Sequence, residues 1–249
     1  MKPAVIGIIA CALLALAIAA FAPASLLDRR IAAASGGKVR LVDATGTVWN
    51  GRGALANETG TWRSPIAWTV AWTALAKGAL AVALEPVAGT TTPRGTLDAT
   101  TTGFSLHDVT IELPARALAD ALPGRVPVVL GGTVTLAAGE FAWDGQRGRG
   151  AFDVRWRDAR LVAAGTIASL GSVDAAFVPQ DGSLLARVTN SGGDVRIDGT
   201  VTLAAAGGSA DLTVVAQPGA PDAIARALTG LGTPDGSGAV RIAWRSDAR

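Results

Sequence analysis

The chain has almost none of the side chains on which catalysis and metal binding usually depend. Cysteine and histidine occur once each, as Cys11 and His107, and tyrosine is absent from the 249 residues. A single cysteine excludes an intrachain disulfide, and a single histidine leaves one conventional base for a nucleophilic triad. The sequence also lacks a phosphate-binding loop and clustered metal ligands. We therefore expect no enzymatic activity, no cofactor and no metal.

Charge is sparse and scattered. Charged residues make up 17% of the chain, and the formal net charge is +2. No stripe of basic residues is present, so nucleic acid is not an expected partner. Aspartate and glutamate occur singly among turns and strand-like segments, which gives no support to a paired-carboxylate site.

Residues 4–22 form a long run without charge. As a helix they would rise about 28 Å, close to the roughly 30 Å hydrocarbon core of a bilayer. They predict a transmembrane signal-anchor over residues 1–24, followed by a juxtamembrane helix or linker over 25–37. The triplet Ala22-Pro23-Ala24 leaves open the alternative of a cleaved signal peptide.

Most of the remaining chain alternates between apolar and polar residues with a period of two. Such alternation predicts antiparallel sheet with one apolar and one wet face, and Gly, Asn and Asp clusters mark the turns. The fold prediction is a mostly β, curved antiparallel sheet domain over 38–249, with two or three short helices. A faint repeat suggests related halves over 38–125 and 126–249. The alternating segments used here are 66–72, 80–84, 104–109, 152–156, 195–197 and 240–244, and the expected helices are 26–34, 115–122 and 222–228.

Within residues 104–109 the period predicts which side chains share a face. Phe104, Leu106 and Asp108 would lie on one face, and Ser105, His107 and Val109 on the other. This placement favours a surface histidine over a catalytic one.

Tryptophan is the aromatic residue that the chain uses most, with seven occurrences. Trp68, Trp72, Trp143 and Trp156 fall at strand-like positions. Two interpretations remain open: they fill the core of a sheet built otherwise from small aliphatic residues, or they line an apolar groove or partner surface.

Two short blocks carry a resemblance to a known family. These are Gly-Thr-Val-Trp-Asn-Gly-Arg-Gly at 46–53 and Pro-Ile-Ala-Trp at 65–68, which follow the apolar N-terminal run. In these features the chain resembles the type II secretion system protein N family of Gram-negative bacteria. The resemblance implies an accessory component of the machine that exports folded proteins from the periplasm, with other secretion-system proteins as partners. It also implies a single pass through the inner membrane, with the bulk of the chain in the periplasm, and it carries over no catalytic residue.

A more distant similarity links the chain to AsmA-like proteins. Those are membrane-anchored, β-rich proteins with an apolar-lined groove, so the similarity implies lipid as a ligand. Strands with one apolar face suit such a groove as well as a closed core. A membrane-anchored, lipid-binding groove is therefore the alternative function.

Overall fold

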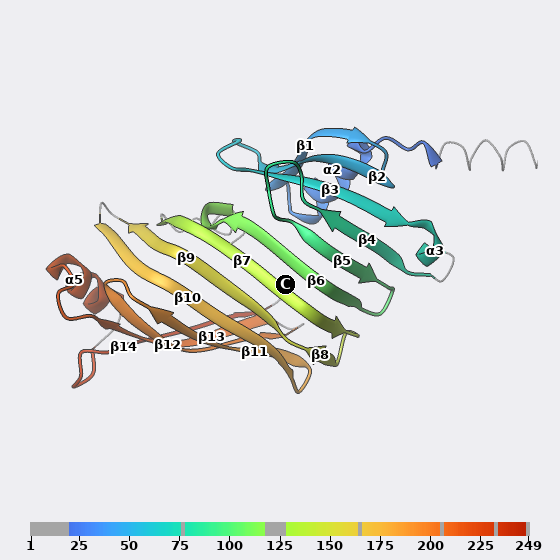
Figure 1. Ribbon diagram of the computed structural model, residues 1–249. Coiled ribbons are helices and arrows are strands. Elements are labelled where there is room, and N and C mark those ends of the chain that lie inside the picture. The colour runs from blue at the N-terminus through green and yellow to red at the C-terminus, as the bar shows by residue number, and fades with distance from the viewer. Residues whose placement is uncertain are drawn as a thin grey trace, which may run out of the picture. The chain divides into compact units, whose positions relative to one another are not determined.

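The computed structural model describes residues 20–75, 78–117, 128–163, 166–204, 207–231 and 234–247 (Figure 1). The strands in these ranges are antiparallel, which confirms the mostly β prediction. The chain divides into two compact units, Met1–Pro93 (unit 1) and Arg94–Arg249 (unit 2). The suggestion of related halves over 38–125 and 126–249 stays a prediction.

Unit 1 is a four-stranded meander with a helix on one face. Its strands follow one another in the order β1-β2-β3-β4, and α2 confirms the helix expected over 26–34. Leu27 and Ile31 of α2 pack against the buried Leu41 of β1 and Trp68 of β3. The elements of unit 1 are α2 (Ser25–Ala34), β1 (Val39–Gly46), β2 (Asn50–Asn57), β3 (Arg63–Ala71), α3 (Trp72–Leu75) and β4 (Leu80–Glu85).

The strand predicted over 66–72 ends one residue early. β3 stops at Ala71, and Trp72 begins the short helix α3. The prediction for Trp72 was therefore wrong. The local reason lies in the residues that follow, Thr-Ala-Leu-Ala-Lys, which include strong helix formers and offer no further alternation.

Unit 2 is a longer meander. Its main strand order is β5-β6-β7-β9-β10-β11-β12-β13-β14, and β8 is a short addition that pairs with β7. The helix α5 confirms the one expected over 222–228. The elements are β5 (Arg94–Ala99), β6 (Phe104–Pro114), β7 (Val128–Trp143), β8 (Gly148–Gly150), β9 (Phe152–Ala163), β10 (Thr166–Gln180), β11 (Ser183–Ser191), β12 (Val195–Ala204), β13 (Gly207–Ala216), α5 (Asp222–Leu231) and β14 (Val240–Asp247).

The sheet of unit 2 curves so that distant strands share one core. Ala159 of β9 and Leu170 of β10 belong to the same buried cluster as Val240 of β14. Ile224 and Leu228 of α5 complete this cluster, and α5 contacts β10, β13 and β14. Figure 1 shows α5 at one end of these strands. The helix thus covers that end of the apolar side of unit 2.

A bulge resets the alternation inside β6 of unit 2. Asp108 in β6 has φ 49°, and the neighbouring Gly95 in β5 has φ 113°. A Cβ on Gly95 would lie 2.5 Å from the Cα of Val109, so only glycine fits beside this bulge. The register between β5 and β6 shows the extra residue in β6, and Val109 packs in the same cluster as Leu106, so it lies on the face of Phe104 and Leu106. The prediction that Val109 shares a face with Ser105 and His107 was therefore wrong.

Some predicted segments lie outside the described residues. The span predicted over 4–22 does so almost entirely, and so does the helix over 115–122 after its first turn at 115–117. Among the residues that the structure describes, no helix has the length and apolar character needed to cross a bilayer.

Candidate partner-binding surface

One face of the unit 2 sheet is apolar across all its long strands. On β9 the residues are Phe152, Val154 and Trp156, and the register places Phe177, Ala175 and Val173 of β10 directly opposite them. The same register continues through β11, β12 and β13 to β14. We call this the apolar face. Further members are Leu106, Val109, Ile111, Leu136, Phe141, Leu184, Val201, Leu203, Leu212, Ile242 and Trp244.

A row of phenylalanines crosses this face at the end away from α5. Phe104, Phe141, Phe152 and Phe177 come from four neighbouring strands, with successive ring centroids 5.8, 5.1 and 4.8 Å apart. Register continues the rung of Phe177 through β11–β13 to Trp244. Such contacts add to the burial of apolar area. This row of rings packs at one end of the apolar face, and α5 packs at the other end.

The end of the apolar face away from α5 is covered less completely than the end beneath α5, although Phe141 and Phe177 are buried there. Phe104, Leu203 and Trp244 remain 39%, 41% and 49% exposed, whereas Val240 and Ile224 are buried. The indole of Trp244 lies beside Gly208, where a Cβ would be 3.5 Å from the ring, an ordinary contact distance. Apolar side chains that gather at one place and stay half exposed are candidates for contact with a ligand or partner.

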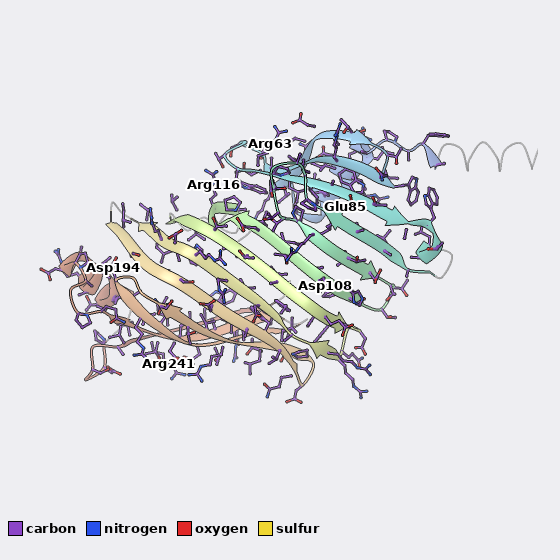
Figure 2. The ribbon with its side chains drawn as sticks, viewed as in Figure 1. Arg63, Glu85, Asp108, Arg116, Asp194 and Arg241 are labelled. Carbon is purple, nitrogen blue, oxygen red and sulfur yellow. The ribbon has the colours of Figure 1, made fainter. Side chains whose placement is uncertain are left out.

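The opposite face of the same sheet is mostly polar and carries ion pairs between adjacent strands, although Val129, Ile167 and Val178 are exposed on it. Arg155 of β9 pairs with Asp174 of β10 at 2.5 Å, and Arg241 of β14 pairs with Asp211 of β13. The Arg241 guanidinium lowers the pKa of the Asp211 carboxyl. Figure 2 labels Arg241 on this face. These pairs are exposed, so they mark the wet side of the sheet and add little stability.

His107 also lies on the polar face. Its Nε2 is 3.5 Å from Oδ2 of Asp98, and both side chains are exposed. This confirms the surface placement predicted for it. No group of three or more His, Cys, Asp or Glu side chains within the described ranges is arranged to hold a metal ion.

The four predicted tryptophans fall into two pairs, one in each unit. In unit 1, Trp68 is buried and its Nε1 donates to the carbonyl of Val48 at 3.1 Å, while Trp72 is 47% exposed and its ring packs on Trp49 with centroids 4.0 Å apart. Trp68 therefore fills a core.

In unit 2, Trp143 and Trp156 are half-buried on the apolar face. The Nε1 of Trp156 donates to the carbonyl of Gly131 at 2.8 Å. Trp244 lies at the half-exposed end of the same face. The alternation over 240–244 predicts which face it lies on, but a period of two does not indicate how exposed it is.

The outer edge of β1 is closed by groups from α2 and its flanks. The Val39 N–H donates to Oγ of Ser35 at 3.0 Å, and the Leu41 N–H donates to Oδ1 of Asp28 at 2.9 Å. The side chain of Arg40 donates to the same carboxylate, and the two interactions lower the pKa of Asp28 to about 2. Strand edges that are satisfied in this way do not offer a free ladder to another chain.

Comparison with known proteins identifies the family. The family model of type II secretion system protein N matches residues 37–243. The chain belongs to this family. The matched segment begins just before β1 and ends within β14, so it includes strands of both units and leaves out α2. No protein with curated annotation and no solved structure gives a significant match.

Membership makes the chain a component of the type II secretion system. The family resemblance seen at 46–53 and 65–68 is thereby confirmed. In this chain, the block at 46–53 contains the last residue of β1, the turn between β1 and β2 and the first half of β2. Gly51 accommodates the ring of Trp68, because a Cβ there would lie 2.6 Å from the indole. The motif therefore has a structural role in unit 1.

Proposed function

We propose that this protein is a non-enzymatic accessory component of the type II secretion machinery, anchored in the inner membrane, with both units in the periplasm. The observation that carries the proposal is the family match across the strands of both units. The uncharged run at 4–22 supports the anchor. The apolar face and the mostly polar, ion-paired face of unit 2 support a binding role, because each is an extended surface that crosses several strands.

The role in secretion is tested by deleting the gene in a strain with a complete machine. We expect exported enzymes to accumulate in the periplasm, and the full chain supplied in trans to restore their release. Undiminished secretion in the deletion strain would contradict the role. A matched variant carrying Arg187→Ala, a change at an exposed ion pair, should restore release as well as the wild type.

The anchor is tested separately by sequencing the N-terminus of the mature protein. An uncleaved chain that stays with the inner membrane supports the anchor. A product beginning at Ser25 would show cleavage after Ala24 and remove it.

The half-exposed end of the apolar face favours a second candidate, binding of lipid. Leu203 and Trp244 would contact the acyl chains, since both are partly exposed and lie on the same face. Native mass spectrometry of the purified chain should then show bound phospholipid, and Leu203→Glu with Trp244→Glu should remove it. Arg245→Glu is the matched control, because it places the same charge on the polar face of β14. Wild-type protein free of phospholipid would eliminate this candidate.

A further inference from the structure

The hydrogen-bonding row on the outer edge of β14 follows from the register of its neighbours. The Gln217 N–H donates to the carbonyl of Asp194 at 2.8 Å, one residue beyond the ends of β12 and β13 and in register with them, so this position is hydrogen-bonded in the β12–β13 alternation. Hydrogen-bonded pairs alternate along an antiparallel ladder. Carried across β13, the alternation directs the backbone N–H and C=O groups of Arg241, Ala243 and Arg245 away from β13.

Among the residues that the structure describes, only the first position of this row has a partner. The Ala239 N–H donates to Oδ1 of Asp235 at 3.0 Å, and the Ala239 carbonyl accepts from the Asp235 N–H at 2.9 Å. Beyond that turn, the described ranges supply no hydrogen-bonding partner to the outward groups of Arg241, Ala243 and Arg245. With respect to the described part of the chain, β14 is therefore an open edge over three alternate residues.

We propose that β14 binds an extended segment of a partner protein as an added strand, and that this segment alternates apolar and acidic side chains. Main-chain hydrogen bonds to the open row would provide affinity, and the side chains on the two faces would provide selectivity. The proposal deepens the proposed function and rests on it for the existence of a partner in the secretion machinery.

The charge and exposure of β14 define the chemistry of the added strand. On the polar face, Arg241 is shared with Asp211, while Arg245 is exposed and makes no ion pair with any described residue. On the apolar face, Trp244 is 49% exposed beside the half-buried Ile242. Cross-strand neighbours of opposite charge and apolar neighbours stabilise a sheet. An added strand would therefore pair favourably on both faces if it placed an acidic residue beside Arg245 and an apolar residue beside Trp244.

The same charges disfavour a second copy of this chain as the added strand. Two β14 strands paired antiparallel about Ala243 would place Arg241 of each copy beside Arg245 of the other. Like charges directly opposite one another destabilise a sheet. A heterologous acidic strand has no such conflict.

The test uses the full chain in detergent and a synthetic eight-residue peptide of alternating Val and Glu, with blocked ends. We expect the peptide to slow hydrogen exchange of the amides of Arg241, Ala243 and Arg245 by about tenfold or more. A peptide with Lys in place of Glu should give no protection. The variant Ala243→Pro should lose the protection, because proline removes an outward N–H and is tolerated at a strand edge. Ala243→Val, which keeps that N–H, should retain it.

Reversing the charge at Arg245 gives a second test, because a misfolded variant would lose binding of both peptides instead of changing which peptide it binds. Arg245→Glu should reverse the preference, so that the Lys peptide protects β14 and the Glu peptide does not. Equal protection by both peptides on the wild type, or none by the Glu peptide, would overturn the proposal. Protection that rises with protein concentration in the absence of peptide would assign the edge to a second copy and overturn it too. Trapping of exported enzymes in the deletion strain without peptide binding would defeat this inference alone, whereas peptide binding with intact secretion would defeat the proposed function.

Discussion

The two units of this protein differ in how each protects its own sheet. In unit 1 a single helix, α2, covers the apolar side chains around Trp68, while Asp28 and Ser35 close the edge of β1. In unit 2, α5 covers one end of the apolar face, and the Asp235 turn closes only the first position of β14. A sheet can therefore have its edge and its face covered by different elements. In the described part of unit 2, some of the β14 edge and some of the apolar face stay uncovered.

The largest expected effect contrasts one tryptophan from each unit. Trp68→Ala should lower the free energy of unfolding by about 3–5 kcal/mol, because it leaves a cavity in a closed core. Trp244→Ala should cost about 1 kcal/mol or less, because the indole is already half exposed. Urea unfolding followed by far-UV circular dichroism measures both. Similar losses in the two variants would show that the end of unit 2 is as closed as the core of unit 1.

An intermediate effect is expected from the carboxylate that closes β1. Asp28→Asn should lower the free energy of unfolding by about 1–2 kcal/mol, since the Leu41 N–H and Arg40 lose a charged acceptor. The folded pKa of Asp28 lies at about 2, below its ordinary value of 3.8. Its stabilising contribution is therefore present above about pH 4 and is lost as the pH falls toward 2.

Urea titrations between pH 5 and pH 2 check this dependence. Asp28→Asn should be less sensitive to acid than the wild type over that range. Asp43→Asn is the control, because Asp43 pairs with Arg63 at an exposed position and should contribute little. An unchanged acid sensitivity in Asp28→Asn would contradict the role of this carboxylate.

The smallest effect is local to β14. Asp235→Ala should speed hydrogen exchange of the Ala239 amide by about tenfold, since its acceptor is lost, and should leave the urea midpoint unchanged. Asp235→Asn retains an oxygen at the same place and should exchange more slowly than the alanine variant. A fall in the urea midpoint of Asp235→Ala would show that this turn supports more than one edge position.

The sequence predicted strands where alternation was uninterrupted and failed where one residue altered it. Residues 152–156 lie in β9 as expected, with Trp156 on the apolar face. Val109 was misplaced because Asp108 adopts a positive φ. Aspartate tolerates this conformation better than most residues, but its presence does not say which aspartate forms a bulge. The period of two therefore predicts which face a side chain lies on only within a stretch of strand that has no bulge.

The sequence predicted that the sheet has an apolar face, but it did not predict which part of that face is exposed. Alternation indicated an apolar face, and it named Trp156 correctly as one of its residues. Whether a side chain on that face is covered depends on α5 and on the curvature that brings β9 and β14 into one core. Those are contacts between residues distant in sequence, and a period of two contains no information about them.

The meander topology has a consequence for how the chain reaches its folded state. Within each unit, strands pair with neighbours along the chain, and only the short β8 interrupts the succession. Most strand pairs therefore close across a short connection, whereas β14 pairs with β13 across α5 and the core that joins β9 to β14 forms between distant residues. A chain that emerges from its N-terminus onward can form one hairpin after another. Each apolar strand then stays unpaired only until the next strand has emerged.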